Sequence, residues 1–587
     1  MGWLKPSPPP FDLDEWRSKP YLARLRPCCQ DWAVHGFGTP YAIYFLYVFK
    51  LVVFSLGAFL VVSLTTPGIG GLGDIGDWWT QPIVFQKIVV WTLLWEILGL
   101  GSGSMPLAFR FSPMIGGVLY WLRPGTIRMP PWPDRVPGTA GSRRTLLDIA
   151  LYGGVLVSGL YLLLSDGDGG LLDRAGIVIT LALLALLGLR DKVSFLAARP
   201  EVYGLMLIVS LFAASTQIAG WQLVMVCIWL GAAASKLNHH FPYVISVMIS
   251  NTPWNRSSKM KERLWVDWPN DVRPSRFAAF AAHLGTAWEF TWPLVLLFSS
   301  GGTIGTIAVI AMVLFHVHIT STFALGVPLE WNLFMIFGLL FLFGHYGDVP
   351  LSTLDPLLLV VIVVVGVLIP VLGNLFPEKI SFLPSMRYYA GNWATSKWMF
   401  RKSTDAEGKF DRDLFKVAPV NVEQLKRMYD DETAEYLIDG GLAFRALHSH
   451  GRALTGLLGR AVDDVDGYHV REGELISGLA NGWNFGDGHF HHKQLLDAVQ
   501  DQCRFDPRDV RMIALESQPA HIQRQRYRIY DAASGLIEEG WVNVADMRAR
   551  GPWLEEDWDF PVEVTGGAAD SGGAGDPDRR AGAAPVA

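Results

Sequence analysis

Three ionisable residues lie inside or at the end of strongly apolar segments. Lys236 ends the segment IWLGAAASK, Glu289 lies in AWEFTWPLVLLF, and His316 lies in VLFHVHITSTF. A charge near the centre of a bilayer is costly, so such residues usually face the interior of a helix bundle or a cavity. A lysine can act as a general base or bind an anion, and carboxylates and imidazoles transfer protons. We therefore name Lys236, Glu289 and His316 as candidate catalytic residues.

Each of these residues also has a structural explanation. A lysine at the cytoplasmic end of a helix interacts favourably with the negative helix C-terminus and can extend its amine to the interface. Neighbouring helices can satisfy a buried carboxylate or imidazole. His318 is two residues from His316 and His283 is six residues from Glu289, so neither pair must share a helix face. The catalytic and structural interpretations both remain open at this stage.

Residues close to these segments are candidates for substrate binding. His239 follows the lysine by three residues, and His283 precedes the glutamate. Trp254 belongs to PWNRSSKMKERLWVDWPN, where Trp alternates with Lys and Arg, and a similar stretch covers 121–137. Such composition is typical of interfacial segments that contact anionic headgroups, although aromatic belts of membrane proteins have it too. We predict that His239, His283 and Trp254 contact a substrate.

The segment NGWNFGDGHFHH holds candidate metal ligands. Asp487, His489 and His491 lie close together, with His492 next in the chain. On an extended strand His489 and His491 would share a face. Three ligands from one loop rarely complete a site, and a fourth could come from His448, His450 or His469. The glycines equally suit a turn before a helix with Asp487 as its N-cap, so metal binding by Asp487, His489 and His491 has an alternative.

Other motifs exclude several functions. The sequence has no GxSxG, Walker A, GxGxxG, HExxH or EF-hand pattern, which removes the enzyme classes that depend on them. Its four cysteines form no CxxC and predict no disulfide framework. The net charge of -6 is small for 587 residues and does not indicate a nucleic-acid partner. No pattern indicates a cofactor, so cofactors stay unknown.

The distribution of apolar residues predicts a polytopic membrane domain. Half of the residues are hydrophobic and only 18% are charged, against about 25% in an ordinary soluble domain. Before residue 376 we find ten apolar stretches and expect eight to ten spans. The stretches are Tyr41–Thr65, Ile83–Leu100, Leu146–Leu164, Ala175–Leu189, Tyr203–Ile218, Trp221–Ser235, Ala278–Phe298, Thr303–Thr322, Trp331–Phe343 and Pro356–Leu375. Basic connections alternate with non-basic ones, which predicts an even number of spans and two cytoplasmic termini.

The sequence divides into four predicted parts. Residues 1–40 form a cytoplasmic N-terminal arm, 41–376 the transmembrane domain, 384–558 a soluble cytoplasmic α+β domain, and 559–587 a disordered tail rich in Gly and Ala. Within the soluble domain we expect two helices separated by Gly440-Gly441 and a helix over His492–Cys503. We also expect a β-hairpin around Ala532–Gly535.

Three segments carry a resemblance to a known superfamily. They are EVYGLMLIVSLF, CIWLGAAASKLNHHF and VLFHVHITSTFALG, in this order. The region from about Asp191 to Phe343 thereby resembles the membrane core of the vitamin K-dependent gamma-carboxylase-like (HTTM) superfamily. The resemblance implies an α-helical HTTM-like fold, and it gives Lys236 the position of the carboxylase's proposed base. Where the carboxylase has a histidine before Tyr-Gly-Leu, this chain has Arg199 and Pro200, so Arg199 becomes a substrate-binding candidate.

The whole chain also resembles a bacterial multispan transmembrane family of unknown function. The resemblance rests on the order of a membrane half, a GNW motif at Gly391, Asn392 and Trp393, and a C-terminal soluble part. It implies a topology and no activity.

Two functions follow as hypotheses. The first is an integral membrane enzyme that acts on a lipophilic substrate, such as a quinone, polyprenoid or lipid, in a pocket among the spans. The alternative is a non-catalytic protein for handling, transport or scaffolding of lipids or envelope precursors. Both place the chain in the plasma (inner) membrane as a multi-pass protein, with the bilayer and a lipophilic small molecule as partners.

Overall fold

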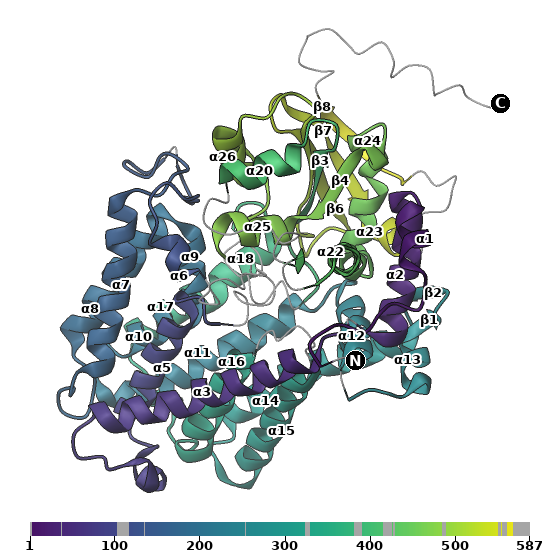
Figure 1. Cartoon of the computed structure of the whole chain (residues 1–587). Coiled ribbons are helices and arrows are strands. Elements are labelled where there is room, and N and C mark those ends of the chain that lie inside the picture. Colours follow the sequence, from purple (N-terminus) through teal and green to yellow (C-terminus); the bar gives the residue numbers. More distant parts are fainter. Residues whose placement is uncertain are drawn as a thin grey trace.

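The computed structural model combines membrane helices with a C-terminal domain that contains a β-sheet (Figure 1). It describes residues 3–567 except 37, 102–116, 134, 253, 323–328, 381–389, 415–424, 427–428, 484–488, 550–552 and 554–559. The helices and the sheet confirm the prediction of a helical membrane half followed by a smaller α+β part.

Five helices of the described residues are long and apolar enough to cross a membrane. They are α3 Tyr41–Thr65, α7 Leu146–Leu164, α11 Ala214–Ser235, α15 Gly302–Thr322 and the segment Pro356–Leu375, which comprises α17 Pro356–Val363, η5 Val364–Leu368 and α18 Ile369–Leu375. In the apolar 18-residue stretch of α11, 72% of the residues are buried. In the corresponding stretch of α3, only 22% are buried. Helix α11 is therefore central, and α3 is peripheral.

Further apolar helices complete the membrane half. They are α5 Pro82–Ile97, α8 Arg174–Arg190, α10 Leu205–Val209, α14 Arg276–Phe298, and α16 Leu329–Gly338 continued by η3 Leu339–His345. Helices α5 and α8 have 16 and 17 residues, short of the length that spans a bilayer upright. The structure thus supports five candidate spans, which is a smaller set than the eight to ten that we predicted from apolar stretches.

The predicted span Tyr203–Ile218 is wrong. Helix α10 ends at Val209, and α11 begins at Ala214. The side-chain amide of Gln217 donates to the carbonyls of Ser210 and Phe212, at 3.1 and 2.9 Å, and so satisfies the exposed backbone at this break. Hydropathy did not reveal the break because the residues on both sides of it are apolar.

Short elements connect these helices. They are η1 Leu72–Asp74, α4 Ile75–Trp78, α6 Val118–Trp121, α9 Lys192–Ala197, η2 Pro200–Gly204, α12 Phe241–Asn251, α13 Ser258–Leu264, β1 Trp265–Asp267, β2 Asp271–Pro274 and η4 Leu351–Thr353. Strands β1 and β2 pair antiparallel. Several of these elements lie against the C-terminal domain, and α6 and α12 help to form the sites described below.

The C-terminal domain is built on a six-stranded antiparallel sheet in the order β4-β3-β5-β6-β7-β8. The strands are β3 Thr395–Arg401, β4 Tyr468–Glu472, β5 Val510–Leu515, β6 Arg524–Asp531, β7 Gly535–Asn543 and β8 Glu563–Gly567. The predicted hairpin around Ala532–Gly535 is confirmed by the pairing of β6 with β7. Strand β8 lies within the tail that we predicted to be disordered from residue 559, so that prediction is wrong for residues 563–567.

Within the described residues of this domain, eight helical segments accompany the sheet. They are α20 Ala406–Leu414, α22 Asp431–Ala446, α23 Ser449–Gly456, α24 Leu458–Ala461, η6 Val465–Gly467, α25 Gly473–Asn481, α26 Lys493–Cys503 and α27 Val544–Ala549. Helix α22 runs through Gly440 and Gly441, so the predicted break there is wrong. Each helical glycine costs about 1 kcal/mol, and the packing of Ala443 and Ala446 into a buried cluster with the N-terminal helices offsets that cost.

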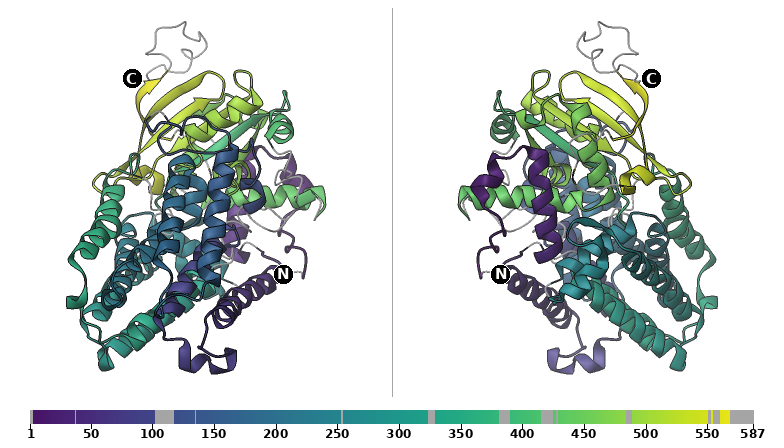
Figure 2. Two further views of the ribbon diagram at one scale, coloured as in Figure 1. Left: turned by 90° about the vertical axis from the view of Figure 1, so that its left-hand side faces the viewer. Right: turned by 90° about the vertical axis from the view of Figure 1, so that its right-hand side faces the viewer.

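The N-terminal arm is folded onto the C-terminal domain (Figure 2). Its helices are α1 Leu13–Ser18 and α2 Tyr21–His35. The Nε atom of Arg17 lies 2.8 Å from Glu435 Oε2, and the Tyr436 hydroxyl donates to Asp31 Oδ2 at 2.5 Å. Glu435 and Tyr436 both belong to α22, so these contacts hold the N-terminal arm against the C-terminal domain.

The C-terminal domain also contacts the membrane half directly. The Trp121 indole donates to Asn481 O at 2.8 Å, and Ala520 N donates to Asn374 O at 2.8 Å. The largest cluster of buried apolar side chains contains residues from both parts. The two halves of the sequence therefore share one core.

Gly451 provides a test of this packing. A Cβ atom at Gly451 would lie 1.9 Å from the backbone oxygen of Arg445, whereas a Cβ at Gly440 would meet nothing within 4 Å. We expect Gly451→Ala to destabilise the protein by about 2 kcal/mol or more, because the clash involves backbone. Thermal unfolding of the detergent-purified chain measures the effect. The matched variant Gly440→Ala should melt at or above the wild-type temperature, and an equal shift in both variants would contradict the packing.

Candidate functional site

The structure brings Lys236 and Glu289 together. Lys236 caps the C-terminus of α11, Glu289 lies in α14, and the Lys236 Nζ atom is 2.5 Å from Glu289 Oε2. Both side chains are buried, and the Lys236 amine also lies 5.6 Å from the ring centre of Phe241. Glu289 thus gives the Lys236 amine a partner within the protein. The ion pair therefore favours a binding or structural role for Lys236 over that of a general base.

His316 lies on the same side of α11 as this ion pair. The Trp229 indole donates to His316 Nε2 at 3.0 Å, and His316 Nδ1 lies 2.7 Å from Asn332 Oδ1. Because an indole only donates, Nε2 accepts and Nδ1 carries the proton of a neutral imidazole. Trp229 and Lys236 are seven residues apart, or about two helical turns, and so share one face of α11. His318 is exposed, as the spacing from His316 predicted.

The first turn of α16 extends this polar line. Glu330 accepts from the Lys50 amine of α3 at 2.6 Å and from the Trp95 indole of α5 at 3.3 Å. Two residues later, Asn332 contacts His316. Lys50 and Glu330 are both buried. One line of paired polar groups inside the membrane half thus takes residues from helices α3, α5, α11, α14, α15 and α16. Sequence reasoning missed Glu330 and Asn332 because their partners are distant in sequence.

Arg199 joins this line to the C-terminal domain. Its guanidinium carbon lies 5.5 Å from the ring centre of Trp331 in α16 and 5.9 Å from that of Trp483 in the C-terminal domain. Arg199 is buried and has a φ of 52°, a left-handed conformation that is uncommon for a residue other than glycine. Its cation–π contacts stabilise the junction between the two parts.

The other predicted substrate-binding residues lie apart from this line. His239, His283 and Trp254 are exposed, and within the described residues none of them bonds to the ion pair. The Trp254 indole instead donates to Ser321 O at 2.8 Å, at the end of α15. Their roles in substrate binding stay predictions.

A buried group of polar residues occupies the junction next to Lys236. His240 Nδ1 lies 2.6 Å from the Ser449 hydroxyl, and His240 Nε2 lies 2.8 Å from Gln518 Oε1. The imidazole stacks on that of His450, with ring centres 4.8 Å apart. Sequence reasoning singled out His239, yet the buried residue is its neighbour His240, because the fold places the C-terminal domain on that side.

The segment Gly391-Asn392-Trp393 lies at the same junction. Gly391 has a φ of 75°, and a Cβ there would be 3.0 Å from His240 O. Asn392 and Gln518 exchange two hydrogen bonds of 2.8 and 2.7 Å between side chain and backbone. The Trp393 indole donates to Glu474 Oε1 at 2.7 Å. This segment joins the membrane half to the sheet, which is a structural reason for its residue types.

The predicted metal ligands are rearranged in the structure. Asp487 lies outside the described residues. His489 and His492 come together with Glu516, which follows β5, whereas His491 is not part of this group. His489 has a φ of 58° and is not on a strand, so the expectation that His489 and His491 share a strand face is wrong. Glu516 could not be found from the local sequence because it is 24 residues beyond His492.

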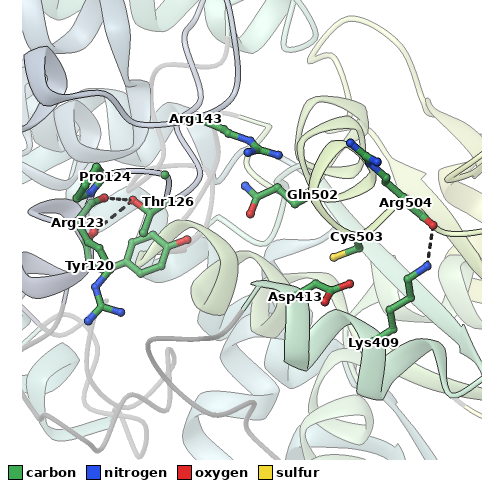
Figure 3. A pocket seen from close by; sticks show the side chains of 11 residues that line it. Tyr120, Arg123, Pro124, Thr126, Arg143, Lys409, Asp413, Gln502, Cys503 and Arg504 are labelled. Carbon is green, nitrogen blue, oxygen red and sulfur yellow. Dashed lines mark hydrogen bonds between the residues drawn. The ribbon is translucent and has the colours of Figure 1, made fainter.

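A cationic pocket lies between the membrane half and the C-terminal domain (Figure 3). Its volume is about 800 Å³, and it is lined by Tyr120, Arg123, Pro124, Gly125, Thr126, Arg143, Lys409, Asp413, Gln502, Cys503 and Arg504. Four of these residues are cationic and one is acidic. The Lys409 amine donates to the backbone oxygen of Arg504 at 2.7 Å. Among the described residues, Arg123, Arg143, Lys409 and Arg504 form no ion pair with a carboxylate.

Buried ion pairs next to this pocket position its walls. Arg144 pairs with Asp191, and Arg190 Nε lies 2.5 Å from Asp148 Oδ1. The carboxylate of Asp148 also accepts from Thr145 N at 2.7 Å and so caps the start of α7. Arg143 lies two residues before Thr145, the N-cap of α7. The ion pairs of Arg144 and Asp148 therefore fix the backbone beside Arg143, whereas its own guanidinium is exposed.

Comparison with known proteins gives a family. The family described as "Transmembrane protein of unknown function (DUF3556)" matches residues 1–565. The chain belongs to this family. No curated protein and no solved structure matches it. The membrane location predicted from the apolar segments is thus confirmed, whereas the HTTM resemblance stays a prediction. The DUF3556 match covers both the membrane helices and the C-terminal sheet, in agreement with their shared core.

Buried histidines at the junction predict how the stability of this DUF3556 protein depends on pH. Burial lowers the pKa of His240 and of His448 from 6.5 to about 3. The unfolded chain therefore takes up protons at a higher pH than the folded chain does. The stability that these neutral histidines contribute is present above about pH 6.5 and falls as the pH decreases, by about 1.4 kcal/mol per pH unit and histidine.

We expect the thermal midpoint to fall between about pH 7 and about pH 5, and to fall less in His448→Gln than in the wild type. The exposed His521 provides a matched control, and His521→Gln should keep the wild-type pH dependence. An equal pH dependence in all three proteins would refute the contribution of His448.

Proposed function

We propose that this protein binds an amphipathic lipid with an anionic headgroup, and that the pocket of Arg123, Arg143, Lys409 and Arg504 receives the headgroup. One observation carries the proposal: these cations line a cavity of about 800 Å³ without a carboxylate partner among the described residues. Arg123, Arg143 and Arg504 are exposed and Lys409 is half-buried, so an anion from outside can reach them. Arginine binds phosphate groups through paired hydrogen bonds, which suits a phosphate-containing headgroup.

The position of the pocket supports a lipid as the ligand. Arg143 lies three residues before Leu146, in the first turn of α7. Leu146 and Leu147 are 75% and 54% exposed, which is typical of a helix face in contact with acyl chains. A headgroup in the pocket can therefore leave its acyl chains in the bilayer.

This proposal corresponds to the lipid-handling alternative from the sequence. It places the C-terminal domain and both termini in the cytoplasm, at the inner surface of the plasma membrane, because the basic connections lie on that side by the positive-inside rule. A second pocket of about 580 Å³ has a mixed lining that includes Arg135, Glu378 and Lys379, so its charge favours an anion less.

A second candidate function is that of an enzyme that acts on a lipophilic substrate among the spans. The line of buried polar groups from Lys236 and Glu289 to His316 supports it, because such groups are rare in membrane interiors without a role. In this candidate Glu289 accepts a proton and Lys236 stabilises a developing negative charge. The ion pair disfavours the version in which Lys236 is the base.

The cationic pocket is tested by the double variant Arg143→Gln/Arg504→Gln. We expect wild-type protein to bind phosphatidylglycerol more tightly than phosphatidylcholine with the same acyl chains. Since each lost charge-assisted contact removes about 1 kcal/mol, the variant should bind phosphatidylglycerol about 10- to 100-fold more weakly. Native mass spectrometry of the detergent-purified chain measures both affinities.

Arg412→Gln is the matched control. Arg412 is exposed on the same helix as Lys409 and pairs with Asp405 outside the pocket. It should leave lipid binding unchanged. Equal affinities of wild type and double variant for phosphatidylglycerol would disprove the headgroup site.

The ion pair is tested by removing one or both charges. Lys236→Met leaves Glu289 buried without its cation, and we expect a loss of about 3–5 kcal/mol. The double variant Lys236→Met/Glu289→Leu removes both charges and should regain most of that stability. Thermal unfolding measures stability, and mass spectrometry measures the lipophilic molecules that co-purify.

A role in substrate binding requires that the stable double variant has lost a molecule that the wild type retains. If the double variant is stable and its co-purified molecules are unchanged, the ion pair is structural and the second candidate fails.

A further inference from the structure

Three side chains of types that ligate metals meet beside the end of β5, an interior strand of the C-terminal sheet. His489 and His492 precede α26, and Glu516 follows the last residue of β5. Two imidazole nitrogens and one carboxylate oxygen lie within 4.8 Å of one another. We propose that His489, His492 and Glu516 bind a divalent first-row transition metal ion. This site is separate from the cationic pocket and does not depend on the proposed lipid function.

The surroundings of His492 orient it as a ligand. Its Nε2 atom lies 3.3 Å from the carbonyl oxygen of Thr395 and donates a hydrogen bond to it. The proton is then on Nε2, and the lone pair of Nδ1 faces Glu516 Oε2 at 3.9 Å. Metal-ligating histidines typically use their second nitrogen in this way, which fixes the tautomer and the ring orientation.

Glu516 is also held in place. Its Oε1 atom accepts a hydrogen bond from the backbone N–H of Ser517 at 2.9 Å. The backbone oxygen of Glu516 accepts from the side-chain amide of Gln525 at 2.8 Å. Both its carboxylate and its backbone are therefore fixed, and Oε2 remains directed at the two imidazoles.

His489 completes the group from a strained backbone. Its φ of 58° is in the left-handed region, which costs energy for a residue with a Cβ atom and is often found at functional sites. Its side chain is 17% exposed, against 5% for Glu516. The Glu516 carboxylate is therefore buried, whereas the His489 imidazole is partly exposed, and an ion can enter from solvent past His489.

In the metal-free arrangement a proton occupies the centre of the group. His489 Nε2 lies 2.7 and 2.9 Å from the two carboxylate oxygens and hydrogen-bonds to them. Two ligand atoms at about 2.0–2.1 Å from a tetrahedral ion are about 3.3 Å apart. Binding therefore requires His489 Nε2 and the carboxylate to separate by several tenths of an ångström, and His492 Nδ1, at 3.9 Å from Glu516 Oε2, to move closer. When the ion binds, His489 Nε2 gives up this proton to solvent and Nδ1 takes up another, so His489 coordinates the ion as a neutral imidazole and no net proton is released.

The ligand set suggests the class of ion. Two imidazoles and one carboxylate suit zinc, iron, cobalt or nickel better than calcium or magnesium, which prefer oxygen ligands. With neutral histidines the group carries one negative charge, so a divalent cation is attracted. Three protein ligands leave at least one coordination position for water or a substrate.

The location links the group to the membrane junction. Thr395, which orients His492, is the first residue of β3 and follows Trp393 by two positions. Trp483, six residues before His489, contacts Arg199 of the membrane half. An ion here lies within the part of the domain that is fixed against the membrane helices.

Metal binding is tested on the full-length protein in detergent, after tag removal and dialysis against a chelator. Zn²⁺ or Co²⁺ is then titrated, and bound metal is measured by inductively coupled plasma mass spectrometry. We expect about one equivalent per chain, and for Co²⁺ the visible absorption of a low-coordinate site. His489→Gln and Glu516→Gln should weaken binding at least about tenfold.

His521→Gln is the matched control, since His521 is an exposed histidine five residues after Glu516. It should bind metal as the wild type does. Zn²⁺ should raise the melting temperature of wild type and His521→Gln but not of His489→Gln, which keeps the test valid if Glu516→Gln folds poorly. Wild-type protein without bound metal, or His489→Gln with wild-type affinity, overturns the proposal.

Discussion

The pairing of buried charge is the constraint on which this structure depends. A charged group is expensive inside a membrane protein, and the cost falls when an opposite charge or a hydrogen bond accompanies it. The pairs Lys50–Glu330 and Lys236–Glu289, with His316 between its tryptophan and asparagine partners, satisfy this constraint. Because each partner comes from another helix, the same contacts set how α3, α11, α14, α15 and α16 pack.

The junction between the membrane half and the C-terminal domain follows the same logic. His240 of the membrane half is buried only because Ser449 and Gln518 of the C-terminal domain satisfy both of its ring nitrogens. Asn392 then holds Gln518 through two hydrogen bonds. The domain is therefore a fixed part of the membrane protein, and a site at the junction has walls from both parts.

Polar groups that are fully paired within the protein can be distinguished from polar groups that are available to a ligand. Where both charges of a pair are present, as in Lys236–Glu289, the contribution of the pair to folding stability is enough to account for the residues. The cations around the pocket of Figure 3 are different, since within the described residues they form no ion pair with a carboxylate. The group of His489, His492 and Glu516 combines both properties. Its side chains are hydrogen-bonded within the protein, and these hydrogen bonds orient ligand atoms toward a common centre. Both groups lie in or beside the junction between the membrane half and the C-terminal domain.

The sequence by itself determined the membrane character, the polar C-terminal domain, the β6–β7 hairpin and the presence of buried ionisable groups. These follow from local composition and periodicity, which the bilayer and the sheet impose on each segment separately. The tertiary structure alone decided the partners: Glu289 for Lys236, Glu330 for Lys50, and Glu516 for His489. It also revealed the break at Ser210 and the helical course through Gly440-Gly441. Such features depend on contacts between residues distant in sequence, and no local pattern encodes them.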